Sequence, residues 1–369
     1  MPPSVLELFR RLTAVPTAPF HEAAVARQVL SWVRAHLRGR VRVQRRRGGL
    51  MVCYRGGGPG PALVLAAHLD HPGFHIRSVT RTGARAVLQG GHPRQLLEGF
   101  PVEAFPARPR DNRPAAVGIL GPPPKKGNAF ALTWTQPPRP GARLAFGVLA
   151  LTPWAVEKGW VSSRSIDDVL GCAVALETLR RAAAARIKAN LTVFLHRAEE
   201  VGFVGALDFA RRGQASAEDS IVSIEASRSL PGARPGRGPV IRLGDKALLF
   251  DANLIGLLDQ AAAVLAKRRN PVQRRRLTGG TCEATAYQAF GYEAAGVALP
   301  LVNYHNGIGA RRIAPEMVRV EDVLGCVELL LAAARLFPAA PLRGVWRRRL
   351  GLRQRRSGTL LQRASARWR

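Results

Sequence analysis

The chain has 369 residues, of which 47% are hydrophobic, so it can form a large buried core and more than one domain. It contains no apolar run near the ~20 residues that a membrane span needs, and its charged first residues predict an amphipathic helix, not a signal peptide. Lys and Arg outnumber Asp and Glu by 56 to 25, a formal charge of +31. The four cysteines are far apart, which favours reduced thiols in a cytoplasmic protein over a disulfide framework or a zinc finger.

The first 70 residues predict two helices followed by three strands. Residues 3–12 and 23–37 place apolar side chains at helical spacing. Residues 41–46 and 49–56 are typical of paired strands. Residues 61–70 form a continuous apolar run, as expected for a strand that is buried on both faces.

Residues 77–157 have a different character from the segments on either side. They are rich in Pro and Gly, contain short strand-like pieces and show no helical periodicity. We therefore predict a small β domain over 77–157, inserted into an α/β domain that comprises residues 1–76 and 158–338.

Strands and helices alternate again from Ser165 onward. This alternation predicts a mostly parallel sheet with helices on both faces. The predicted strands lie at residues 191–200, 220–227 and 294–302, and the predicted helices at 167–187, 205–213, 251–270, 282–292 and 320–337.

The C-terminal segment, residues 339–369, is strongly basic. It holds ten Arg and no acidic residue, so the rest of the chain keeps a net charge of 31 − 10 = +21. The segment has no clear apolar face for packing, and we expect it to be mobile. Nucleic acid is one partner that this charge would attract. Arg scattered through an Ala-, Gly- and Pro-rich body is better explained by compositional bias.

Most of the predicted strands lead into side chains that can bind metal. Functional groups of open α/β sheets gather at the carboxyl ends of the strands. We therefore expect these side chains to lie close together. They are His68, Asp70, Asp167, Asp168, Glu199, Glu200, Glu225 and His305.

Glu199 and Glu200 are adjacent acids at the end of an apolar run, where they add little stability. Their chemistry fits a centre of two metals, about 3.5–4 Å apart, bridged by a carboxylate. Imidazole and carboxylate ligands suit zinc and its neighbours. Glu200 would bind a metal, and Glu199 would point elsewhere and take a proton from the attacking water.

The order of these motifs resembles that of a known enzyme family. HLD, SIDD, AEEVGFVGA, SIEAS, GGT and NYHNG follow one another as in the co-catalytic metallo-aminopeptidases of the glutamyl and tetrahedral aminopeptidase type. Other zinc exopeptidases and deacylases are similar more distantly. The resemblance covers most of residues 3–338 and implies an α/β catalytic domain with an inserted β-barrel. It also implies a homo-oligomer assembled through the inserted domain.

The resemblance implies a set of metal ligands. His68 and Glu225 would bind one metal, and Glu200 and His305 the other. Asp167 would bridge the two. We expect two divalent ions per chain, with zinc as the first choice and cobalt or manganese as alternatives.

The resemblance also implies two further roles. Glu199 would be the general base and then the general acid, and Asp70 would orient the His68 imidazole through its carboxylate. Three features depart from the family pattern. Glu225 stands where aminopeptidases often have Asp. Cys282-Glu283 stands where the family often has Asp-Ala. The last His lies in NYHNG and is not followed by Ser.

Several nearby residues have a structural explanation that is at least as good. Asp168 would cap a helix, His196 would be structural, and His71 and His75 would belong to a loop and a strand. Glu283 could substitute for a ligand, contact substrate or simply begin a helix.

We predict a metal-dependent aminopeptidase that acts on short peptides. Two alternatives remain open from sequence. The first is a metal-dependent deacylase of N-acyl amino acids, which would require the acyl group that an aminopeptidase rejects. The second is a basic binding protein on a peptidase-like scaffold, which the complete ligand set argues against.

Overall fold

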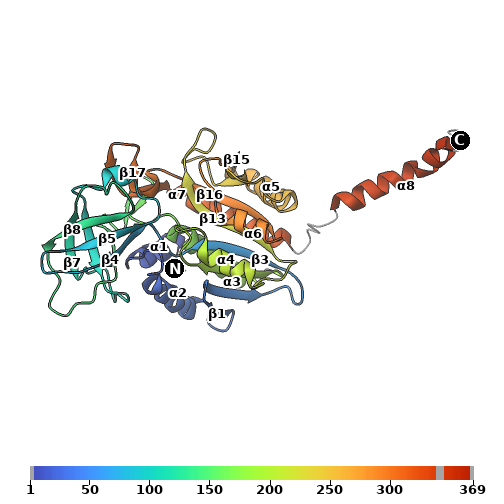
Figure 1. Ribbon diagram of the computed structural model, residues 1–369. Helices are drawn as coiled ribbons and strands as arrows, with labels where there is room; N and C mark the ends of the chain where they lie inside the picture. The colour runs from blue at the N-terminus through green and yellow to red at the C-terminus, as the bar shows by residue number, and fades with distance from the viewer. Residues whose placement is uncertain (1–3, 338–344, 366–369) are drawn as a thin grey trace.

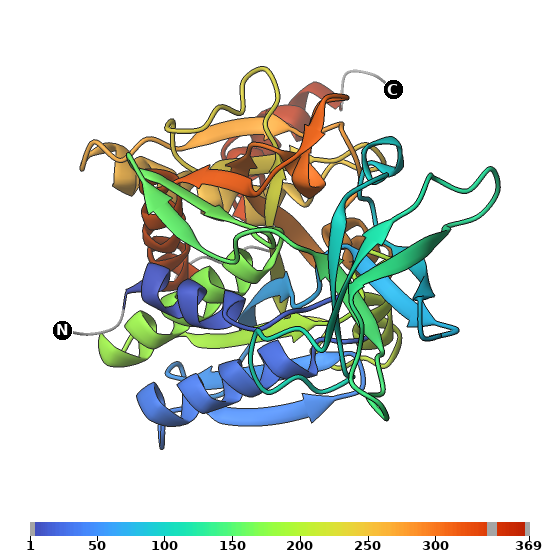
Figure 2. The same ribbon diagram turned by 90° about the vertical axis from the view of Figure 1, so that its left-hand side faces the viewer.

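The computed structural model describes residues 4–337 and 345–365. A large α/β body carries a closed β-barrel on one side, at the left of Figure 1. Figure 2, turned by 90°, shows the barrel beside the same body. The predicted fold class, a mostly parallel sheet with helices on both faces and an inserted barrel-like domain, is confirmed.

An eight-stranded sheet forms the centre of the body, in the order β1-β2-β12-β3-β13-β16-β14-β15. β12, β3, β13 and β16 are mutually parallel, and the antiparallel pairs lie toward the edges. The strands are β1 (Arg42–Arg46), β2 (Gly49–Arg55), β3 (Ala62–His68), β12 (Asn190–His196), β13 (Ser220–Arg228), β14 (Val240–Gly244), β15 (Gln273–Arg276) and β16 (Glu293–Leu301).

The parallel strands are apolar because helices cover both of their faces. All seven residues of both β3 and β12 are buried. α3 packs on β3, β12 and β13, with α1 and α7 beside it, and α4 and α6 pack together near β13 and β16. The helices are α1 (Val5–Thr13), α2 (Ala23–His36), α3 (Val169–Ala184), α4 (Val204–Arg211), α5 (Ala252–Ala266), α6 (Glu283–Ala289) and α7 (Val320–Leu336).

The barrel closes in the order β4-β5-β8-β7-β6-β9 around a small core of its own. Phe74 and Phe130 meet edge to face in this core, with ring centroids 6.3 Å apart. The strands are β4 (Gly73–Arg77), β5 (Gly83–Gln89), β6 (Pro101–Phe105), β7 (Ala116–Leu120), β8 (Ala129–Gln136) and β9 (Phe146–Leu149), with the 3-10 helix η1 (Arg94–Leu96) between β5 and β6. The division of the chain at residues 77 and 157 stays a prediction.

Two smaller sheets lie outside the eight-stranded sheet and the barrel. β10 (Ala155–Glu157), β11 (Trp160–Ser163) and β19 (Glu316–Arg319) form the first. β17 (Gly307–Ile308) and β18 (Arg312–Ile313) form the second, directly after the 3-10 helix η2 (Tyr304–Asn306).

The C-terminal segment contains a helix, α8 (Val345–Ser365), drawn apart from the other elements in Figure 1. The sequence pattern did not predict this helix, because its many Arg residues leave no continuous apolar face. Residues 338–344 and 366–369 lie outside the described residues, and the expected mobility of the segment stays a prediction. Across the described ranges, 4–337 and 345–365, no helix combines the length and apolar character needed to cross a bilayer.

Phe194 shows how the body depends on the packing of its central strands. It is fully buried on β12 and stacks on Phe209 of α4, with ring centroids 4.2 Å apart. We expect Phe194→Ala to lower the free energy of unfolding by about 3–5 kcal/mol, because the change leaves a cavity. Urea unfolding of the variant measures this. Phe290→Ala is the matched control, since Phe290 is 45% exposed. An equal loss in the two variants would contradict the prediction.

Candidate metal centre

The residues expected to form the site meet at the carboxyl ends of the parallel strands. His68 is the last residue of β3, and Glu199 and Glu200 lie in the loop after β12. Asp167 lies between β11 and α3, and His305 lies in η2 after β16. These segments are far apart in the sequence, so the parallel sheet brings their side chains together.

The His68 imidazole is buried and held from behind. Its Nδ1 donates to the main-chain oxygen of Asp70, 3.1 Å away, because a carbonyl oxygen can only accept. Its Nε2 therefore faces the acids, 3.5 Å from Oδ1 of Asp167 and 3.8 Å from Oε2 of Glu199. This tautomer is the one that metal-binding imidazoles need.

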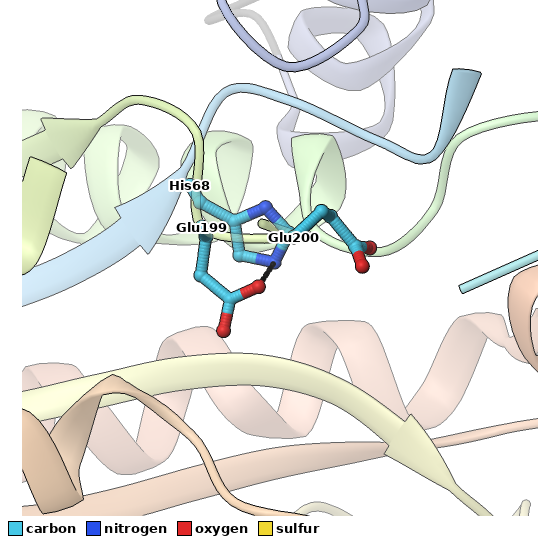
Figure 3. Close-up of side chains that lie close together, drawn as sticks. All are labelled: His68, Glu199 and Glu200. Carbon is cyan, nitrogen blue, oxygen red and sulfur yellow. Dashed lines mark ion pairs between the residues drawn. The ribbon is translucent and has the colours of Figure 1, made fainter. Parts of the chain in front are cut away.

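Glu199 and Glu200 point to different sides of the His68 ring, as Figure 3 shows. Glu199 pairs with His68, whereas Oε1 of Glu200 lies 3.3 Å from Nε2 of His305. Two adjacent carboxylates thus reach two different places, which agrees with the divergence expected from the sequence.

The His305 imidazole has the same arrangement as that of His68. Its Nδ1 donates to the main-chain oxygen of Gly91, 3.0 Å away, which leaves Nε2 directed at Glu200 and at Oδ2 of Asp167, 3.6 Å away. The ring also stacks on Tyr304, with centroids 3.7 Å apart.

Asp167 lies between the two imidazoles and offers one carboxylate oxygen to each. Burial alone raises the pKa of Asp167, but the nearby His305 and His68 imidazoles outweigh it and hold the pKa well below its usual range. The carboxylate is therefore ionised and placed between two nitrogen ligands.

Among the described residues, four sets of three side chains bring ligand atoms within 4.8 Å of one another. Two of these sets share Asp167: one is His68, Asp167 and Glu225, and the other is Asp167, Glu200 and His305. The remaining two are His68, Glu199 and Glu200, and Glu225, Cys282 and Glu283. Glu225 is buried within β13 and not at its end. Two imidazoles and three carboxylates without thiolate suit zinc, manganese or cobalt.

The polar atoms of these acids fit a bound cation. Within the part of the chain that the structure describes, Oδ1 of Asp167, Oε1 of Glu200 and Oε1 of Glu225 are buried without a hydrogen-bond partner. Buried, unpartnered carboxylate oxygens are costly unless a cation or proton satisfies them. The residues present therefore fit bound divalent metal.

The electrostatics of the imidazoles lead to the same conclusion. Burial alone lowers the pKa of His68 and His305, but the carboxylates outweigh it, chiefly Glu199 for His68 and Glu200 for His305, and raise both pKa values well above the usual range. For the Glu199 carboxyl the effect of burial has the opposite sign, and it raises the pKa. The His68 charge opposes this rise, and the Glu200 charge adds to it. The site has an excess of negative charge that needs positive charge at its centre.

Asp70 faces His68 with its carboxylate and, more closely, with its main-chain oxygen. Oδ1 of Asp70 lies 3.7 Å from Nδ1 of His68, farther than the main-chain oxygen of the same residue. The carboxylate accepts the main-chain N–H groups of Glu199 and Glu200, at 3.0 and 3.2 Å. Asp70 thus fixes the loop that carries the adjacent acids.

Glu316 is a residue that the sequence did not single out. Its buried carboxylate accepts the main-chain N–H groups of Ile166, Asp167 and His305 at 2.8–3.0 Å. It thereby links a metal-ligand loop to η2. An isolated acid near the last strand carries no sequence signal for this role, because its partners are as many as 150 residues away.

Asp168 is the N-cap residue of α3 by position, but its carboxylate makes no capping hydrogen bond. It accepts the main-chain N–H of His68 at 3.3 Å instead.

His71 contacts the main-chain oxygen of Asp167 at 2.5 Å, while His75 contacts the main-chain oxygen of Pro19, outside the site. His71 therefore supports the site from outside both ligand sets.

Glu283 begins α6 and lies fully buried next to Glu225. It accepts from Nε2 of His196 at 3.0 Å. Burial raises the pKa of Glu283, but Glu225 and His196 outweigh it and bring the pKa to about 2. The His196–Glu283 pair agrees with the expectation that His196 is structural. Glu283 lies next to the candidate ligand Glu225 and belongs to neither set that contains Asp167.

Comparisons with known proteins identify the family and the fold. The sequence matches the M42 glutamyl aminopeptidase family over residues 144–329, just over half of the chain. The structure is similar to that of the Pyrococcus horikoshii TET1 peptidase, described as assembling into a tetrahedron or a large octahedral shell (TM-score 0.71, 20% identity, 90% of this chain and 99% of that one). It is also similar to a TET aminopeptidase from a marine-sediment thaumarchaeon (0.74, 17%, 90% and 96%) and to an aminopeptidase from Desulfurococcus kamchatkensis (0.72, 20%, 90% and 94%).

The structural likenesses, all at low sequence identity, establish the shared fold, and the sequence match establishes the family. The basic binding protein without catalytic activity is thereby set aside. The protein belongs to the M42 glutamyl aminopeptidase family and is a hydrolase that acts on peptide bonds.

Proposed function

We propose that the protein is a dinuclear metal-dependent aminopeptidase that removes N-terminal residues from short peptides. The observation that carries this proposal is the position of Asp167, whose two carboxylate oxygens face Nε2 of His68 and Nε2 of His305. A carboxylate between two nitrogen ligands is the arrangement that a pair of bridged ions requires.

His68 and Glu225 would hold one ion, Glu200 and His305 the other, and Asp167 both. We propose zinc, with cobalt and manganese as alternatives. Bound ions would polarise the scissile carbonyl and make a water molecule easier to deprotonate.

Glu199 is proposed as the group that moves the proton. Its carboxylate reaches the centre beside His68 and belongs to neither set that contains Asp167. It would accept the proton of the attacking water and deliver it to the leaving amine. Asp70 would keep this carboxylate in place through the N–H of Glu199.

The substrate preference is inferred from access to the site. Side chains of Glu199, Glu200 and His305 are only 11%, 6% and 10% exposed, so a narrow approach favours a chain end over the middle of a chain. We also propose a homo-oligomer that assembles through the barrel, in line with the assemblies described for the P. horikoshii peptidase.

Metal content measured together with a substrate panel tests this proposal. The panel holds free-amine aminoacyl anilides and N-acyl amino acids, assayed before and after chelation. We expect about two ions per chain and chelator-sensitive cleavage of the free-amine substrates alone. Cleavage of the acylated set alone would make the protein a deacylase, the alternative favoured by Glu225 in place of Asp. A chain that binds no metal would overturn the proposal.

A further inference from the structure

A turn of the barrel, residues 90–93, reaches across to the His305 loop. We infer that this turn positions His305, so that the barrel completes the second half of the metal centre. The inference rests on the proposed function only in taking His305 as a metal ligand.

Two hydrogen bonds connect the turn to His305. The ring Nδ1 of His305 donates to the main-chain oxygen of Gly91 at 3.0 Å. The Nδ1 of His92, a buried ring, donates to the main-chain oxygen of His305 at 3.1 Å. The barrel therefore holds both the ring and the backbone of this residue.

Close packing requires glycine at position 91. A Cβ atom added there would lie 2.4 Å from Nδ1 and 2.7 Å from Cε1 of His305, closer than real Cβ atoms approach other groups. The backbone of Gly91 is outside the left-handed region, so alanine would introduce no strain of its own. A substitution at Gly91 thus acts on the His305 ring.

The two candidate imidazole ligands differ in what holds them. Nδ1 of His68 donates to Asp70, two residues away on the same loop, so its orientation is local. Nδ1 of His305 donates to a residue 214 positions away in another part of the fold. The orientation of the His68 ring is consequently independent of the barrel, whereas that of the His305 ring depends on it.

Gly91→Ala should therefore weaken one ion and spare the other. Loss of the group that orients a metal-binding imidazole typically lowers metal affinity about 10–100-fold. We expect a loss of this size for the ion at Asp167, Glu200 and His305, and wild-type affinity for the ion at His68 and Glu225. Zn²⁺ titration of the full-length protein against a chromophoric chelator measures both affinities. His305→Ala and His68→Ala identify which ion is which.

Gly121→Ala is the matched control. Gly121 also lies in the barrel with an ordinary φ, and a Cβ there would meet Ala131 at a normal 3.5 Å. This variant should bind both ions as the wild type does. A wild-type chain that holds fewer than two ions would count against the proposed function, whereas the effect of Gly91→Ala relative to Gly121→Ala tests the inference itself.

A double-mutant cycle tests whether Gly91 acts through His305. With His305 replaced by Ala, the ring that the new Cβ would meet is gone. Adding Gly91→Ala to His305→Ala should therefore change neither the remaining ion affinity nor the melting temperature. If Gly91→Ala alone does not fold, His305→Ala should restore folding. Wild-type binding of both ions by Gly91→Ala, equal weakening of both ions, or additive effects in the double variant would overturn the inference.

Discussion

Glu199→Gln is expected to lower kcat/KM for a free-amine anilide by about 10²–10⁴-fold, the usual contribution of a general base. Glutamine preserves the shape of the side chain but cannot take a proton from water. Because Glu199 lies in neither set that contains Asp167, the variant should still bind two ions. Steady-state kinetics on the metal-loaded protein, with metal content measured on the same sample, gives both quantities.

Glu218→Gln is a suitable control, since Glu218 is exposed and lies after α4 away from the ligand loops. It should match the wild type in kinetics and in metal content. A Glu199→Gln variant that keeps activity within tenfold of wild type would show that another group accepts the proton. Loss of metal from this variant would assign Glu199 to the ligands.

Asp167→Asn is expected to have the second large effect, which is loss of both ions together. Asp167 is the one residue common to both sets, and an amide offers only one carbonyl oxygen and no negative charge. Without ions, several kcal/mol of transition-state stabilisation are lost, so kcat/KM should fall by at least about 10³-fold.

His305→Ala provides the comparison, because His305 belongs only to the second set. It should lose one ion and keep the other. Metal analysis after gel filtration distinguishes the two variants. An Asp167→Asn chain that keeps one ion tightly would mean that the carboxylate serves a single metal, and the bridged arrangement would be wrong.

Some of the site could be predicted because its signals are local. His68 and Glu199 follow apolar runs long enough to cross a sheet, so hydrophobic periodicity located them at strand ends. The adjacency of Glu199 and Glu200 also determined that their side chains diverge, since successive side chains of a chain point in different directions. The match of motif order then suggested the family.

The orienting contacts were not predictable in this way. Asp70 was expected to hold His68 through its carboxylate. The nearer contact of His68 Nδ1 is the main-chain oxygen of Asp70, while the carboxylate, 3.7 Å from that nitrogen, also accepts two main-chain N–H groups. Which atom of a residue faces a neighbour depends on loop dihedral angles, which composition and periodicity do not specify.

The sequence by itself thus determined the alternating strands and helices of the α/β body and its buried sheet, because these follow from hydrophobic spacing within each segment. The candidate ligand residues came from motif order and the family resemblance. Only the tertiary structure decided that Asp167 faces two imidazoles, that Glu316 fixes two loops, and that Gly91 holds His305. The last of these joins residues 214 positions apart, and such contacts are set by how the barrel packs against the sheet.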